Sequence, residues 1–423
     1  MLGLPNHRSA RLSNKAKATA ATVSTWRVAI LIAALPLFSS AFQYVIDAPV
    51  LYALSKAWPL LTFPLALWAA TRIGPGYQPL ILACCVWLIA AVPFISVIQL
   101  GNDAVGAVAS SVKVWPMTGA LGLLALLTML RPTPDDLKRA ILVLAGISFV
   151  FLAAAWFLAP DTLFNQTIET TKVFLADPER GRRINAPMMY AILGLFILNR
   201  SLWSAAPTGS WPRLFKAALI LMGLIMMATI YKQRAQIGGT VVVLGLGAIF
   251  SWGRWRMPGL LVMVAVILAA IVPAGMWLAQ GAVESLGGSL SIRQIEAEAA
   301  INFLNAEPWR WITGVGSAGR IGNVTLSDIV GTPFFFPSDL GWLGVVFEYG
   351  VIGAGLMLAL HLVAIRNAGR IARSGGVLER GLFDYALFLL VVSPVVSVVL
   401  QPGEMATILA LCGWLAMRRC GVR

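Results

Sequence analysis

Residues 337–343 read Pro-Ser-Asp-Leu-Gly-Trp-Leu, and they lead into an apolar run that ends with Gly-Val-Ile-Gly at 350–353. Most of the chain is apolar, but the segment before this motif, from about residue 281, is long and polar. It contains Arg293, Arg310, Arg320 and a Gly-Val-Gly turn at 314–316. The sequence therefore predicts a large loop outside the membrane that re-enters it at residues 337–343.

The composition indicates a membrane protein. Of the 423 residues, 59% are hydrophobic and 12% are charged, whereas soluble proteins carry about 25% charged residues. Apolar runs close to the ~20 residues that a helix needs to cross a bilayer recur along the chain. A β-barrel would instead show alternating segments of about ten residues. We expect an all-α polytopic membrane protein.

The apolar runs divide the chain into about twelve expected transmembrane helices. Residues 1–27 form a basic tail, 28–280 hold spans one to nine with an outer loop at 160–186, 281–340 form the large loop with a surface helix, and 341–423 hold the last three spans and a short basic tail. The expected spans are 28–47, 49–70, 79–100, 112–130, 139–159, 187–203, 214–231, 235–252, 257–280, 341–366, 382–400 and 402–418.

Charge placement predicts that both termini are cytoplasmic. With this orientation about two thirds of the Lys and Arg residues fall in inner segments, as the positive-inside rule requires. The net charge of +14 then needs no nucleic-acid partner. The basic, acid-free residues 1–27 also fit an organellar transit peptide, although a cytoplasmic tail is the simpler interpretation.

Some cations do not follow this sorting. We expect Lys56 and Lys113, in or near apolar runs, to extend their ammonium groups to the membrane surface. The others fall on the outer side, where a retained cation is a functional hypothesis. They are Lys172, Arg180, Arg182, Arg183, Lys232, Arg234, Arg293, Arg310 and Arg320.

The acidic residues near the motif have structural and functional interpretations. Asp339 suits a helix N-cap, and a carboxylate at the membrane surface can also accept a proton from a sugar hydroxyl. Glu348 lies within the apolar run and needs a partner inside the bundle. Residues 291–294, Ser-Ile-Arg-Gln, predict a capping box. The apolar stripe of the helix that follows, with Glu296 turned away from it, predicts a surface helix; the stripe is Ile292, Ile295, Ala299 and Phe303.

Each cation also has a simple interpretation. Arg234 and Lys232 suit a clamp on a diphosphate, since Arg binds phosphate oxygens in a bidentate fashion, but they equally suit lipid headgroups. Arg293 is spaced to pair weakly with Glu296 on one helix. The remaining loop arginines, Arg180, Arg182 and Arg183, are also explained as solvated loop charges. Two histidines do not suffice for a histidine-based metal site.

The order of these motifs resembles the O-antigen ligase and Wzy-type polysaccharide polymerase superfamily. In that superfamily an outer-face Arg opens a span, matched by Arg234, and a later periplasmic loop carries an Arg on a helix, matched by Arg293. The Gly-x-Gly turn at 314–316 follows. The loop then enters a helix through a signature residue, an aromatic, a Leu and a Gly-x-x-Gly; the matching residues are Asp339, Trp342, Leu343, Gly350 and Gly353.

The resemblance covers residues 215–366 and is to the polymerase branch, because ligases usually have His where Asp339 stands. It implies a glycosyltransferase-C-like fold in the bacterial inner membrane with a periplasmic active face. It also implies an inverting transfer from undecaprenyl-diphosphate-linked sugars that needs no metal or other cofactor. Asp339, Arg234 and Arg293 would be catalytic; Lys232, Arg320, Arg180, Arg182, Arg183 and Trp342 would bind substrate.

The expected function is polymerisation of lipid-linked repeat units into exopolysaccharide or O-antigen. Its partners would be membrane lipid, the undecaprenyl-diphosphate-linked glycan and a candidate chain-length regulator, with no nucleic acid. Two alternatives stay open. One is an O-antigen ligase, which moves finished glycan to lipid A-core or protein. The other is a secondary transporter, which would show related halves, broken helices and polar groups near the midplane.

Overall fold

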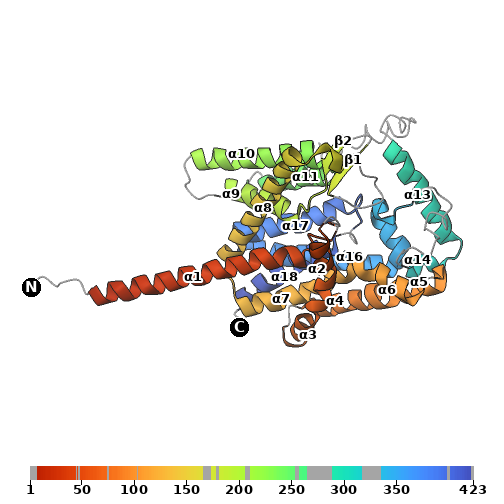
Figure 1. Ribbon diagram of the computed structural model, residues 1–423, viewed down its shortest axis with the longest axis horizontal. Coiled ribbons are helices and arrows are strands. Elements are labelled where there is room, and N and C mark those ends of the chain that lie inside the picture. Colours follow the sequence, from red (N-terminus) through yellow and green to blue (C-terminus); the bar gives the residue numbers. More distant parts are fainter. Residues whose placement is uncertain are drawn as a thin grey trace, which may run out of the picture.

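The computed structural model describes a helical protein with one small hairpin (Figure 1). The described residues are 7–43, 45, 48–73, 76–101, 103–164, 173–177, 181–204, 210–252, 257–263, 288–316, 335–397 and 401–420. The hairpin pairs β1 (Phe174–Asp177) with β2 (Gly181–Ile184) in antiparallel register. It lies in the predicted outer loop at 160–186.

The helices run as follows. In the first half they are α1 (His7–Phe38), α2 (Pro49–Leu61), α3 (Phe63–Arg72), α4 (Gln78–Cys85), the π-helix η1 (Val86–Ala91), α5 (Val92–Leu100), α6 (Ala104–Ser111), the 3-10 helix η2 (Val112–Thr118), α7 (Gly119–Leu130), α8 (Pro134–Leu158), the 3-10 turn η3 (Asp161–Phe164) and α9 (Met189–Leu202). They continue with α10 (Ser210–Met226), the π-helix η4 (Met227–Tyr231), α11 (Arg234–Ser251), α13 (Gly288–Asn305), α14 (Trp309–Thr313), the 3-10 turn η7 (Pro337–Leu340), α16 (Gly341–Arg373), α17 (Val377–Val392) and α18 (Pro402–Arg419).

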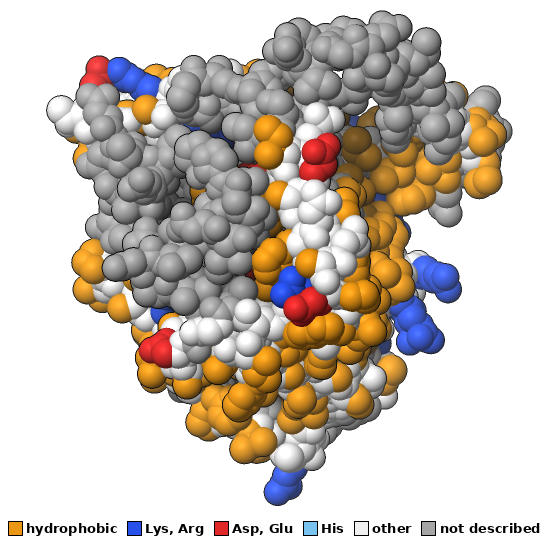
Figure 2. All heavy atoms as spheres, turned by 90° about the vertical axis from the view of Figure 1, so that its right-hand side faces the viewer, with side chains coloured by type: hydrophobic (Ala, Val, Ile, Leu, Met, Phe, Trp, Pro, Cys, Tyr) orange, Lys and Arg blue, Asp and Glu red, His pale blue; other side chains and the backbone are white. Residues whose placement is uncertain are grey.

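Among the described residues, seven helical stretches are long and apolar enough to cross a membrane: Pro49–Arg72, Gln78–Gln99, Ala104–Leu130, Pro134–Leu158, Pro212–Tyr231, Arg234–Ser251 and Pro337–Arg373. Two shorter apolar helices are Val23–Phe38 and Met189–Leu202. Hydrophobic side chains cover much of the described surface in Figure 2. The prediction of an all-α, multi-pass membrane protein is confirmed. The number of twelve spans stays a prediction, and most of the expected span 257–280 lies outside the described residues.

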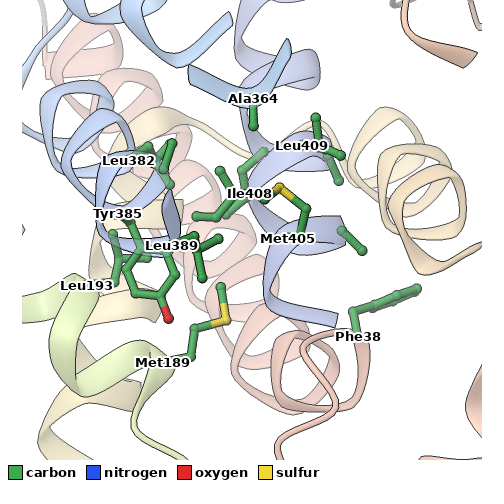
Figure 3. Packing of buried hydrophobic residues seen from close by; sticks show 14 of the residues in the cluster. Phe38, Met189, Leu193, Ala364, Leu382, Tyr385, Leu389, Met405, Ile408 and Leu409 are labelled. Atoms are coloured by element: carbon green, nitrogen blue, oxygen red, sulfur yellow. The ribbon is translucent and has the colours of Figure 1, made fainter. Parts of the chain in front are cut away.

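Two helices form the centre of the bundle. Almost every described residue of α9 up to Arg200, and of α18 from Pro402 to Leu415, is buried. Both are apolar on all sides, which is typical of a helix enclosed by other helices. Side chains of α9, α17 and α18 pack together around Tyr385, whose hydroxyl lies on the side of Met189 (Figure 3).

A buried charge network joins three helices where α9 ends. Arg200 on α9 forms a bidentate pair with Asp384 on α17, with both N–O distances at 2.6 Å, and also donates to the Gly247 carbonyl on α11 at 2.8 Å. The two charged side chains are 4% and 0% exposed. Removing one partner of such a pair typically costs about 3–5 kcal/mol. The network therefore fixes α9, α11 and α17 relative to one another.

The tenth expected span, α16, is broken at Gly350, which has φ 69° and ψ 178°. The carbonyls released by the break have partners. The Val315 and Gly316 amides donate to the carbonyls of residues 347 and 348 at 2.7 and 3.1 Å, and the Trp87 indole donates to that of Tyr349 at 2.9 Å. The backbone of the Gly-x-Gly turn predicted at 314–316 therefore packs into the break in α16, and we call this turn the wedge.

The break also contains the partner that Glu348 was predicted to need. The Lys113 ammonium group lies 2.5 Å from its carboxylate, and their side chains are 25% and 7% exposed. Lys113 was expected to extend toward the membrane surface, and in the structure its ammonium group pairs with Glu348. Since this pair joins η2 to α16, over a separation of 235 residues, the sequence pattern did not reveal it.

The structure contains a helix where one was predicted in the large loop, but its details differ from the prediction. Helix α13 begins at Gly288, so Ser291 is inside the helix and the predicted capping box is wrong. Its buried face contains Glu296, whereas Ile295 of the predicted stripe is 54% exposed. The reason is that α13 packs against the protein: Ala300 and Leu304 join a second apolar cluster built around Phe347 of α16.

Candidate functional site

A cavity of about 320 Å³ opens at one end of the bundle. This volume lies within the range of small-ligand pockets, roughly 300–1,000 Å³. Five segments distant in sequence form it: the turn after α1, the entry to α9, the η4–α11 turn, residue 338, and Val396 with the entry to α18. The lining residues are Ser39, Ser40, Ala41, Gln43, Val45, Asn185, Ala186, Pro187, Met188, Met189, Tyr190, Tyr231, Gln233, Gln236, Ser338, Val396, Gln401, Pro402, Gly403 and Glu404.

The lining combines apolar side chains with polar ones and is nearly uncharged. Its polar groups are carboxamides, serine and tyrosine hydroxyls and one carboxylate, that of Glu404. Among the lining residues that the structure describes, none is Lys or Arg. Carboxamides and hydroxyls both donate and accept hydrogen bonds, as sugar hydroxyls do. The described lining is therefore suited to a polyhydroxylated ligand and poorly suited to a bare diphosphate.

Glu404 lies in the first turn of α18 and is held from α17. Its Oε2 accepts a hydrogen bond of 2.6 Å from the Tyr385 hydroxyl, and Tyr385 is fully buried. Glu404 itself is only partly buried, although its helix neighbours are buried, and it lines the cavity. The carboxylate is thus fixed in place and faces the open space.

Further hydrogen bonds hold the wall of the cavity. The Tyr190 hydroxyl donates to the Leu35 carbonyl at 2.6 Å and that of Tyr231 to the Gln236 side chain at 2.7 Å. Gln233 donates to the Asn185 side chain at 2.8 Å. These bonds connect the η4–α11 turn to the hairpin's exit and α9 to α1. The wall is preorganised by contacts between separate elements.

Ser40 is strained at the cavity. Its φ of 59° is in the left-handed region, where residues other than glycine cost energy. Its hydroxyl is buried and has no hydrogen-bond partner within the described protein. A Cβ at Gly403 would come within 2.5 Å of that hydroxyl oxygen. Strain and an unpaired hydroxyl in a cavity wall are typical of a ligand-binding position.

The cations predicted near the diphosphate lie beside the cavity. Arg234 is the first residue of α11 and is exposed, next to the lining residue Gln233. Lys232, with φ 57°, places its ammonium group 5.4 Å from the centre of the Trp156 ring. Arg183 lies on β2, which packs against η4.

The other predicted arginines divide into those with structural partners and those outside the described residues. Arg182 pairs with Asp161 at 2.6 Å and lies 5.4 Å from the Phe164 ring centre. Arg310 pairs with Glu307 and lies 4.4 Å from the Phe303 ring centre, so it stabilises the loop itself. Arg180, Arg320 and Lys172 lie outside the described residues.

Asp339 lies in the 3-10 turn η7 and is exposed. The N-cap of α16 is Leu340, without a side-chain cap, so the capping interpretation of Asp339 is wrong. Its neighbour Ser338 lines the cavity. Asp339 and Arg293 both lie close enough to Glu296 for their charges to affect its pKa. Burial raises the pKa of Glu296, the Asp339 charge raises it further, and a hydrogen bond from the Phe336 amide and the Arg293 charge lower it.

Trp342, predicted to bind substrate, packs within the bundle. Its indole donates to the Ser393 hydroxyl at 2.9 Å and meets the His361 ring edge-on at 5.8 Å. It is not among the lining residues of the cavity. Asp339, Arg234 and Arg293 are also outside the lining, whereas the residues immediately before the first two, Ser338 and Gln233, belong to it.

Sequence reasoning missed the residues inside the cavity. The signal that could have identified Glu404 is a lone carboxylate in the first turn of an apolar span after Gln401-Pro402-Gly403. Tyr385 and Ser40 carry no local motif. Their positions at the cavity depend on the tertiary arrangement of α17, α18 and the end of α1.

Comparisons with known proteins do not assign this chain to a family. No protein-family model and no curated protein matched the chain. One chain of a solved structure, described as "Structural coordination of polymerization and crosslinking by a peptidoglycan synthase complex", aligns over 79% of this chain and 96% of its own length. The two share 18% identity with a TM-score of 0.42. At these values the likeness supports no conclusion about this chain.

Proposed function

We propose that this protein is a bacterial inner-membrane glycan polymerase, which joins lipid-diphosphate-linked repeat units on the periplasmic face. The single observation that carries the proposal is the cavity at the end of a membrane-embedded bundle, with sugar-compatible groups inside and cations beside it. The order of motifs that resembles Wzy-type polymerases supports the same function. The apolar surface suits a substrate whose lipid chain stays in the bilayer.

In this proposal the substrate is divided along the cavity. A sugar ring enters the polar, nearly uncharged interior, and its diphosphate stays at the edge near Arg234 and Lys232. Arginine suits this position because its planar fork binds phosphate oxygens in a bidentate fashion. The cations stabilise the negative charge that the departing lipid diphosphate acquires.

Asp339 is the proposed acceptor-side group. It is exposed in η7, beside the lining residue Ser338. A carboxylate there orients the acceptor hydroxyl or removes its proton as the hydroxyl attacks the anomeric carbon with inversion. The charges of Arg293 and Asp339 both act on Glu296, and this supports a role for Arg293 on the acceptor side.

The secondary transporter is the second candidate, and the break in α16 with the buried Lys113–Glu348 pair is the observation that favours it. In transporters the carbonyls released by a broken helix coordinate the coupling ion or substrate. Here the carbonyls of residues 347–349 already accept hydrogen bonds from Val315, Gly316 and Trp87. The break therefore supports an anchored loop better than an ion site.

The products that accumulate in cells distinguish the candidates. Replacing Arg234 by Ala in the chromosomal gene should leave single repeat units on the lipid carrier and no long polymer, with protein level unchanged. Lost ligase activity would instead leave long unattached polymer, and a transporter defect would leave carrier-linked glycan unaltered.

Arg213→Ala is the matched control for this variant. Arg213 is also an exposed arginine in the first turn of a membrane helix, α10, outside the region of the cavity. It should retain the wild-type distribution of polymer lengths. A wild-type distribution in the Arg234→Ala strain would remove Arg234 from the mechanism.

A further inference from the structure

Helix α14 presents an apolar face away from the protein. Trp309 and Ile312 lie three positions apart on this short helix, and their side chains are 43% and 55% exposed. We infer that α14 and the wedge are inserted into the membrane, where this face contacts lipid acyl chains. The inference concerns the placement of the large loop and does not rest on the proposed function.

The break in α16, into which the wedge packs, lies inside the membrane-spanning part of the bundle. Glu348 follows the start of α16 at Gly341 by seven residues, which is about 10 Å at 1.5 Å per residue. Its partner Lys113 follows the start of the candidate span Ala104–Leu130 by nine residues, or about 13 Å. Two spans therefore place the break at a similar distance below the end of the bundle that carries the loop.

A third span also places the wedge below this end. A Cβ at Gly316 would come within 2.6 Å of the Ser96 Cα, so the wedge lies against the backbone of α5. Ser96 is three residues, or about 4–5 Å, from the end of the candidate span Gln78–Gln99. The wedge therefore extends past the end of the neighbouring span into the bundle.

Helix α14 lies at the same depth as the break. A Cβ at Gly350 would come within 2.1 Å of the Ile312 carbonyl oxygen, and one at Gly314 within 2.5 Å of the Gly350 nitrogen. The last turn of α14 therefore lies directly against the broken turn of α16. Its exposed side chains are placed at the level of the membrane rather than in the water above it.

The backbone of the wedge is paired as a membrane interior requires. The Gly314 amide donates to the Arg310 carbonyl at 2.8 Å, and the Gly314 carbonyl accepts from the Gln99 side chain at 2.7 Å. The amides of the next two residues donate to α16, as described above. Non-helical backbone at membrane depth is tolerated only where protein partners replace water, and the wedge meets this condition.

The charged residue of α14 is turned toward the protein. The Arg310 side chain is 14% exposed, donates to the Phe303 carbonyl at 3.0 Å and pairs with Glu307 at 3.2 Å. A charge that faced the acyl chains would be costly, whereas tryptophan is enriched where membrane meets water. The composition of α14 therefore suits a helix at this boundary.

Helix α13 of the same loop has a different exposed face. Its exposed residues include Glu298, Asn302 and Asn305 as well as Ile295 and Ile301. Polar side chains along the outer face of a helix are typical of contact with water. Within this loop, α13 therefore faces water and α14 faces lipid.

The neighbouring span supplies the surface that α14 extends. Ile98, next to Gln99 at the end of α5, is 79% exposed, as expected of a residue that faces lipid. Figure 1 shows α13 and α14 beside α5 and α6, at the end of the bundle away from the start of α1. The exposed face of α14 thus continues an apolar surface that the bilayer already covers.

Nitroxide labels in vesicles test this placement in the full-length protein. The background carries Cys85→Ala and Cys420→Ala, because Cys84 and Cys412 are buried, and it should take up no label. Cysteines are then introduced singly as Trp309→Cys and Ile312→Cys. Collisions with oxygen, which concentrates among acyl chains, are compared with collisions with a water-soluble nickel chelate.

Two reference positions calibrate the measurement. Ile98→Cys reports a lipid-facing site, and Asn302→Cys reports the water-facing surface of α13 in the same loop. The oxygen-to-nickel ratio at Trp309 and Ile312 should approach that at Ile98 and exceed that at Asn302 several-fold. A ratio equal to that at Asn302 at either position would overturn the inference.

A second measurement needs no introduced cysteine. The difference in emission between the wild type and Trp309→Phe belongs to Trp309, and it should shrink in vesicles of lipid brominated on the acyl chains. An undiminished difference would also overturn the inference. A lipid-facing α14 together with normal polymer in the Arg234→Ala strain would instead count against the proposed polymerase mechanism alone.

Discussion

Three buried or half-buried glutamates show what a single position reveals. The position of Glu348 in an apolar run predicted a buried partner, and its carboxylate forms an ion pair with Lys113. Glu296 was predicted to face outward, yet it is 2% exposed because its carboxylate accepts the Phe336 amide at 3.0 Å. Glu404, in the first turn of α18, lines the cavity, and no sequence motif indicated this. The residue type limits the possibilities, but contacts with residues 19 to 235 positions away in the sequence determine the role of each glutamate.

Glu296 gives the clearest pH prediction. Its pKa is raised mainly by burial, so the folded protein binds its proton more tightly than the unfolded chain does. Its contribution to stability is therefore full below the ordinary pKa of a glutamate and is lost as pH rises through the raised pKa. Hydrogen exchange at residues 335–340 should be slow at low pH and accelerate across that interval.

Glu296→Gln is the matched variant for this measurement, because glutamine keeps the acceptor oxygen and removes the titration. Exchange at residues 335–340 should then lose its excess pH dependence beyond the intrinsic chemical rate. If the variant and the wild type show the same pH profile, Glu296 does not control the docking of the segment that carries Asp339.

At the scale of elements, the sequence predicted where α16 begins and how long it is, but it did not predict the break within the helix. Its start after the Pro-Ser-Asp motif and its apolar length followed from the sequence. The break at Gly350 did not, since glycine is frequent in membrane helices and does not by itself indicate a break. What determines the break is the wedge at 314–316, which replaces the lost helical hydrogen bonds. Likewise, α13 was found as a helix but with the wrong buried face, because the Phe347 cluster determines its orientation.

Substituting Gly350 by Ala tests the wedge. Alanine would have to adopt φ 69°, and its Cβ would come within 2.1 Å of the Ile312 carbonyl oxygen. We expect the free energy of unfolding to fall by at least about 2 kcal/mol.

Gly355→Ala, on the same helix with nothing within 4 Å of its Cβ, is the control for Gly350→Ala. It should be neutral or stabilise by about 0.5–1 kcal/mol. Chemical unfolding in detergent measures both variants. Equal effects from the two substitutions would mean that the break is not held by the loop.

At the scale of the whole molecule, the sequence predicted the class and the order of polar and apolar segments. The length of an apolar run and the distribution of charges are properties of continuous stretches of sequence, so they can be read without a structure. The cavity could not be predicted in this way, because five segments between residues 39 and 404 form its walls. No single sequence motif contains the polar groups that line it. The predicted residues Asp339 and Arg234 come close to it through their neighbours Ser338 and Gln233. The carboxylate inside it, Glu404, required the packing of α18 against α17.

The central claim is that this bundle itself joins lipid-linked sugars at the cavity. The most direct measurement is polymer formation by the purified protein in lipid vesicles supplied with lipid-diphosphate-linked repeat units from the source organism, followed as a ladder of products. The account predicts a ladder with wild-type and Arg213→Ala protein and unextended repeat units with Arg234→Ala or Asp339→Asn. Unextended substrate with the wild type, or an undiminished ladder with both Arg234→Ala and Asp339→Asn, would contradict it.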